Sequence, residues 1–195
     1  ALFWLTLAAP AIAWLVARLN RRIDASYREW LLLVWLSLIA HPLLDAFTVY
    51  GTQLWLPFSD YPVGIGSVFI IDPLVTVPMI VGLIAWLRWR QNATDRGMRW
   101  IRAGLIASTL YLGWTVAAQS HVEGEVRRLI AATPLESRRV LVTPAPFNSL
   151  LGRVIVMDDD AYHEGFRSLF DKNAGIPLER HASDPELLAS LRDDR

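Results

Sequence analysis

The sequence predicts a mainly α-helical, polytopic membrane protein in which four transmembrane helices precede a small extramembrane α+β domain. Of the 195 residues, 53% are hydrophobic and nine are tryptophan, and the mean hydropathy is positive. Four apolar stretches approach the ~20 residues that a helix needs to cross a bilayer. A water-soluble helical bundle is the alternative, but four such stretches would leave it almost no polar face. We therefore expect lipid to be the solvent of this part.

The four spans are expected over residues 1–19, 30–50, 68–87 and 100–119, which form a transmembrane bundle over 1–119. Charged or turn residues bound each stretch. Tryptophans recur near the ends, as expected for side chains that anchor a helix at the membrane interface. These are Trp30, Trp86, Trp89 and Trp100.

The short loops predict the orientation of the bundle. Arginines crowd the connections on one side, and cytoplasmic loops carry such an excess. The loop 51–67 contains no Lys or Arg and one acid, Asp60. We expect this loop and the C-terminal domain to lie on the outer side of the membrane, facing the periplasm or the cell exterior. The arginines in question are Arg18, Arg21, Arg22 and Arg28 in the first connection, and Arg88, Arg90, Arg96, Arg99 and Arg102 around the third.

The extramembrane domain, 120–195, has mixed charge, prolines and short alternating runs. Residues 138–143, 153–157 and 162–169 are expected to form strands of a small antiparallel sheet, with a turn at 158–160. Residues 185–192 are expected to form a final short helix after a Ser-Asp-Pro start.

Composition excludes several kinds of function. Nineteen basic residues balance nineteen acidic ones, so nothing indicates a nucleic-acid partner. The chain has no cysteine, which excludes disulfides, a thiolate nucleophile and cysteine-held metals. A metal ion would have to be held by His, Asp, Glu or carbonyl oxygen.

Polar residues inside the spans are the strongest functional signal, because ionisable groups in a membrane are costly. His41 and Asp45 lie four residues apart on one helical face, which Thr48 continues. Counting inward from Tyr50 and Val68 places Asp45 about 8 Å and Asp72 about 6 Å below the same outer boundary. An imidazole and two carboxylates are a reasonable ligand set for a divalent ion such as Zn or Mn. Equally, His41 and Asp45 can simply bond to each other while Asp72 caps the third helix before Pro73.

Two further residues are candidates for contacts with a substrate. His121 lies just past the fourth span, and Asn148 ends the rigid run Thr-Pro-Ala-Pro-Phe-Asn at 143–148. The alternative for Asn148, a place in a turn that connects two strands, is favoured by its residue type.

Motifs in the same order resemble the YdjM-like family of bacterial inner-membrane proteins, which are described as metal-dependent hydrolases. The matching runs are His-Pro-Leu-Leu-Asp at 41–45, Thr-Val-Tyr-Gly-Thr at 48–52, Pro-Phe-Ser at 57–59, Ile-Ile-Asp-Pro-Leu at 70–74 and Thr-Pro-Ala-Pro-Phe-Asn-Ser-Leu-Leu at 143–151, with 162–171 also similar. The resemblance implies a membrane-embedded metal site to which His41 and Asp45 contribute, with Asp72 close by. Family members carry acidic and histidine-containing segments upstream of the position of Ala1. The resemblance therefore implies that this sequence holds only part of the metal site.

The sequence thus favours a metal-dependent hydrolase near the periplasmic interface that acts on an amphiphilic or lipid-linked ester. His41, Asp45 and Asp72 are the expected ligands, and Asp72, His121 and Asn148 are the expected catalytic or substrate-contacting residues. The alternative is a non-enzymatic membrane scaffold whose polar groups fix helix packing. A transporter is disfavoured because the chain has no inverted repeat. The sequence leaves the oligomeric state open.

Overall fold

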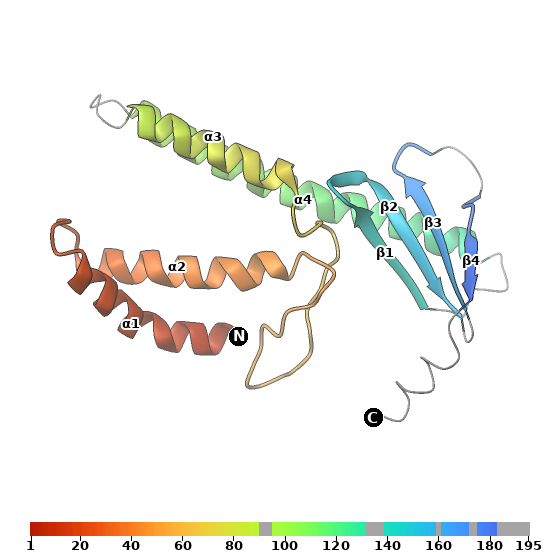
Figure 1. Cartoon of the computed structure of the whole chain (residues 1–195), viewed down its shortest axis with the longest axis horizontal. Coiled ribbons are helices and arrows are strands. Elements are labelled where there is room, and N and C mark those ends of the chain that lie inside the picture. Colours follow the sequence, from red (N-terminus) through yellow and green to blue (C-terminus); the bar gives the residue numbers. More distant parts are fainter. Residues whose placement is uncertain (90–94, 132–138, 159–160, 172–174, 183–195) are drawn as a thin grey trace. The chain divides into compact units, whose positions relative to one another are not determined.

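A computed structural model of the chain describes residues 1–89, 95–131, 139–158, 161–171 and 175–182. Within them lie four helices and a four-stranded antiparallel sheet, which confirms the predicted helical part followed by a β-containing part (Figure 1). The chain divides into two compact units, Ala1–Gly66 and Ser67–Arg195.

The first unit is built on an antiparallel helical hairpin. Helix α1 spans Leu2–Leu19 and helix α2 spans Tyr27–Asp45 (Figure 1). The helices pack through small side chains, because Ala9 and Ala13 of α1 are fully buried against Val34 of α2. Helix α2 begins with a capping box in which Ser26 and Glu29 satisfy each other's backbone N–H groups. The start of α2 is therefore set locally by the sequence.

The segment after α2 completes the first unit as an ordered loop. Gly51 has φ +77°, a conformation that suits glycine. Thr52 and Val63 pair across the loop as an antiparallel bridge. The Ile65 N–H donates to the Ala46 carbonyl at 2.8 Å, so the loop returns to the end of α2.

The second unit contains a tighter hairpin of α3, Pro73–Trp89, and α4, Arg96–Ile130. Glycines allow their backbones to approach closely. A Cβ atom added to Gly82 would lie 2.8 Å from the Trp100 carbonyl oxygen, and one added to Gly104 would collide with the Pro78 carbonyl. The Ser108 hydroxyl donates to the Val75 carbonyl at 2.7 Å, which adds an interhelical hydrogen bond.

The sheet packs on the C-terminal part of α4. Strands β1 (Arg139–Ala145), β2 (Asn148–Met157), β3 (Ala161–Ser168) and β4 (Glu179–Ala182) lie in chain order and are all antiparallel (Figure 1). At about 1.5 Å per residue, the 35-residue α4 is about 52 Å long, which exceeds the ~30 Å thickness of the hydrocarbon core. Its last turns cover the sheet instead. The shared core contains Val122, Val126 and Ile130 of α4 and Val142, Val154 and Val156 of the strands.

The expectation of four membrane spans needs correction. Among the residues described, α1 and α4 are long and apolar enough to cross a membrane by length and composition, and α3 is a shorter apolar helix. Helix α2 does not qualify, because Arg28, Glu29 and His41 lower its apolar content. Exposed apolar side chains nevertheless lie along α1, α3 and α4, for example Leu7, Ile84 and Leu110.

Element ends also differ from those expected. Helix α2 ends at Asp45 rather than Tyr50, and α3 begins at Pro73 rather than Val68. Helix α4 continues through residue 119, where the extramembrane domain was expected to begin, to Ile130. Three strands lie near their expected places, and β4 was not expected. The expected helix over 185–192, and residues 159 and 160 of the expected turn, lie outside the described residues.

Candidate functional site

His41 and Asp45 lie together on the last turn of α2. The His41 Nε2 atom is 3.6 Å from the Asp45 Oδ2 atom, and the two side chains are 82% and 46% exposed. With metal–ligand bonds of 2.0–2.1 Å, two ligands of a tetrahedral zinc ion lie about 3.3 Å apart. A small side-chain rotation would therefore bring this pair to the spacing of two metal ligands.

The surroundings of the pair follow from how α2 ends. Because the helix stops at Asp45, this carboxylate lies at the end of the helix and not five residues before it. The Asp45 carbonyl accepts hydrogen bonds from the Thr48 N–H at 2.9 Å and from the Thr48 hydroxyl at 2.6 Å. Thr48 therefore closes the helix end and does not continue the His41–Asp45 face.

Asp72 caps α3, the role that the sequence offered as an alternative to metal binding. Its Oδ1 atom accepts the Leu74 N–H at 2.9 Å, and its Oδ2 atom accepts the Tyr111 hydroxyl at 2.8 Å. The residue is only 5% exposed. Each carboxylate oxygen has a second lone pair, so the cap leaves acceptor capacity at Asp72.

Tyr111, which the sequence did not indicate as a site residue, connects Asp72 to the sheet. Because the Tyr111 O–H donates to Asp72, the Ser149 hydroxyl must supply the proton of the 2.9 Å bond between Tyr111 and Ser149. The chain Asp72–Tyr111–Ser149 thereby links the start of α3, the middle of α4 and the start of β2. The available signal was a tyrosine in an otherwise apolar span, since a buried tyrosine hydroxyl usually has a hydrogen-bond partner.

His121 and Asn148 have other local partners. His121 lies within α4 and not past its end, with its Nε2 atom 3.7 Å from Glu125 Oε1. Glu125 in turn contacts the buried guanidinium of Arg167 at 3.3 Å. The Asn148 Oδ1 atom accepts the Leu150 N–H at 2.8 Å, the turn role that its residue type favoured. Within the described residues, no hydrogen bond or ion pair joins His121 or Asn148 to Asp72.

The three expected metal ligands belong to different units. His41 and Asp45 are in the first unit and Asp72 is in the second. Within the described part of the chain, no group of three or more His, Asp and Glu side chains is placed to hold a metal ion. The described residues thus bring two of the expected ligands together, and metal binding by this pair and by Asp72 stays a prediction.

Comparisons with known proteins identify relatives of both the helices and the sheet. A family model described as YdjM inner membrane protein matches residues 1–122. The uncharacterized protein YfhP of Bacillus subtilis (strain 168) is 25% identical over an alignment of 166 positions that covers 80% of this chain. The chain spans about half of the length of that curated relative, 49%. No solved structure matches the chain.

Proposed function

The chain belongs to the YdjM family of inner membrane proteins, and from this premise we propose that it is a metal-dependent hydrolase of the bacterial inner membrane. The observation that carries the proposal is the His41–Asp45 pair, whose 3.6 Å spacing is close to that of two ligands on one divalent ion. Zn or Mn suits a set of imidazole and carboxylate ligands.

The chemistry follows from what such an ion supplies. A bound divalent ion lowers the pKa of its water and polarises an ester carbonyl or phosphoryl group. His41 and Asp45 would hold the ion, and Asp72 would be a third ligand or the base that orients the water. His121, which is largely exposed, and the Asn148 amide nitrogen, which its turn does not use, contact substrate.

The substrate class is an amphiphilic or lipid-linked ester. The family places the protein in the membrane, and apolar side chains are exposed along all four of the described helices. A lipid-like substrate reaches such a site by diffusing within the bilayer, with its ester at the interface. We place the His41–Asp45 pair and the C-terminal domain on the periplasmic side.

The experiment is hydrolysis by the full-length protein in lipid nanodiscs, with phospholipids and lipid-linked phosphates as substrates. We expect turnover that EDTA abolishes, that added Zn or Mn restores, and that His41→Ala removes. Ser37→Ala is the matched control, because Ser37 lies one turn earlier on α2 and its hydroxyl donates to the Leu33 carbonyl of the same helix. Turnover that survives both EDTA and His41→Ala would reject the proposal.

One observation favours a second function, a non-enzymatic scaffold. Both Asp72 oxygens are bonded within the protein, and the Asp72–Tyr111–Ser149 chain joins the helical hairpin to the sheet. A scaffold uses these groups to position its C-terminal domain for a partner. It predicts that His41→Ala changes stability alone and that Zn or Mn never raises the melting temperature.

A further inference from the structure

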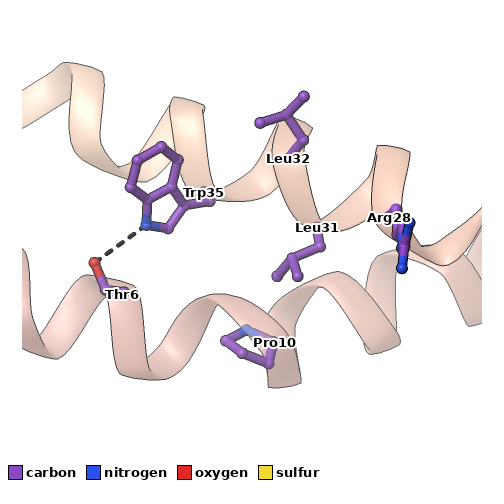
Figure 2. A pocket seen from close by; sticks show the side chains of 6 residues that line it. All are labelled: Thr6, Pro10, Arg28, Leu31, Leu32 and Trp35. Atoms are coloured by element: carbon purple, nitrogen blue, oxygen red, sulfur yellow. Dashed lines mark hydrogen bonds between the residues drawn. The ribbon is translucent and has the colours of Figure 1, made fainter.

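A groove runs between α1 and α2, on the opposite part of the hairpin from the His41–Asp45 pair. Its volume is about 570 Å³, within the roughly 300–1,000 Å³ of small-molecule sites. Figure 2 shows Trp35 and Thr6 at one end of the groove and Arg28 at the other. The lining residues are Thr6, Pro10, Arg28, Leu31, Leu32 and Trp35.

The groove is apolar along its length. Leu31, Leu32 and the Pro10 ring line its middle, and the Trp35 indole N–H already donates to the Thr6 hydroxyl at 3.1 Å. The indole N–H is thereby satisfied, and most of the surface that the middle of the groove offers to a ligand is hydrocarbon. An alkyl chain suits such a surface, whereas a polar solute would lose its hydrogen bonds to water there.

Arg28 supplies the one charged group of the lining. Within the described residues it makes no salt bridge. The adjacent acid, Glu29, is turned to the helix start, where its Oε2 atom accepts the Ser26 N–H at 2.7 Å and the Ser26 hydroxyl at 2.8 Å. The Arg28 guanidinium is exposed, and its planar fork suits a phosphate.

The neighbouring sequence adds positive charge at the same end. Arg18 at the end of α1 and the loop residues Arg21 and Arg22 are all exposed, and the Arg18 guanidinium lies 5.2 Å from the centre of the Trp14 ring. Basic pockets of this kind between membrane helices bind anionic lipid headgroups. Arg28 and Trp35 are seven residues apart, about 10 Å along the helix, which suits the upper part of an acyl chain.

We propose that this groove is a binding site for an anionic diacyl phospholipid, with the phosphate on Arg28 and one acyl chain along Leu31 and Leu32 toward Trp35. The site is separate from the His41–Asp45 pair and does not depend on a metal ion. Such a lipid would contact both α1 and α2 and thereby stabilise the hairpin. Of the two helices, α2 is the less apolar.

Native mass spectrometry of the full-length protein in detergent, titrated with phosphatidylglycerol or phosphatidylcholine, tests the proposal. We expect one tightly bound phosphatidylglycerol, weakened about tenfold by Arg28→Gln because a charge-assisted hydrogen bond is lost. Arg28→Lys should weaken it less, and Leu31→Trp, which fills the groove, should abolish it. Inorganic phosphate should not compete.

Arg22→Gln is the matched control, because it removes the same charge from the adjacent loop but not from the groove. Equal losses in Arg28→Gln and Arg22→Gln would overturn the proposal in favour of diffuse attraction between basic loops and anionic lipid. Equal affinity for phosphatidylcholine, or binding that Leu31→Trp leaves intact, would also overturn it.

Discussion

At the scale of single residues, Asp72 combines a structural role with a proposed chemical one. Its carboxylate caps α3 through the Leu74 N–H and accepts the Tyr111 hydroxyl. Asparagine caps helices about as well as aspartate, and its side-chain oxygen can take one of these bonds. A single substitution therefore separates the two roles.

We predict that Asp72→Asn lowers the free energy of unfolding by less than about 1 kcal/mol but abolishes metal-dependent turnover. Asp72→Ala should cost about 1–2 kcal/mol, because it removes the cap and leaves Tyr111 without an acceptor. Denaturant titration in detergent, beside the nanodisc assay, measures both effects. Full turnover by Asp72→Asn would contradict a chemical role for Asp72 and leave it only its structural role.

The Arg153–Glu164 pair on β2 and β3 predicts a pH dependence of stability. The Arg153 Nε atom donates to Glu164 Oε1 at 2.7 Å, which lowers the pKa of Glu164 below its ordinary value of 4.5. A lowered carboxyl pKa adds stability above the unfolded pKa, and that stability is lost as pH falls through the folded pKa. The pair should therefore stabilise the sheet at neutral pH and cease to do so in acid.

We expect Glu164→Gln to melt at a slightly lower temperature than the wild type at pH 7, with a difference that shrinks as pH falls below 4.5. Thermal unfolding followed by near-ultraviolet circular dichroism at a series of pH values measures this. A difference that stays constant down to pH 3 would show that the ion pair does not cause it.

At the scale of elements, the α3–α4 hairpin depends on close backbone contact. Gly104→Val would place side-chain atoms against the Pro78 carbonyl, and overpacking costs typically 1–3 kcal/mol. We predict that this variant loses at least about 2 kcal/mol. Gly113→Ala on the same helix is the control, because a Cβ atom there meets no atom within 4 Å. It should be neutral or stabilising by up to about 1 kcal/mol. Equal losses would contradict this packing.

Apolar composition predicted the existence of all four helices but misplaced the end of α2, the start of α3 and the end of α4. The residues after Asp45 include Phe47, Val49 and Tyr50, which continue the apolar run although the backbone turns at Thr48. Before Pro73, Phe69 to Ile71 are equally apolar but lie in irregular backbone. Hydropathy measures preference for lipid and does not report where tertiary hydrogen bonds end a helix.

In the candidate site, too, the sequence predicted the local contact but not the long-range contacts. The i, i+4 spacing of His41 and Asp45 placed them together, because that contact is local to one helix. The Asp72–Tyr111–Ser149 chain joins residues 38 and 39 positions apart, and no local pattern encodes such a contact. The length of α4 was missed because its last turns are amphipathic and face a sheet instead of lipid.

At the scale of the whole molecule, the arrangement in the membrane is the main prediction. The chain contains no cysteine, so single cysteines can be introduced and labelled in intact cells with a membrane-impermeant maleimide. We expect labelling of Asp60→Cys and Phe170→Cys from the periplasm and none of Arg22→Cys until the membrane is opened. All three side chains are exposed. The reverse pattern would place the C-terminal domain in the cytoplasm.

Metal content of the full-length protein tests the central claim most directly. After equilibration with Zn or Mn and removal of free ions, mass spectrometry of the purified protein gives the number of ions per chain. We expect bound metal in the wild type, its loss in both His41→Ala and Asp45→Ala, and its retention in His121→Ala, whose residue forms the same i, i+4 pair on another helix. Unchanged stoichiometry in His41→Ala and Asp45→Ala would contradict the account.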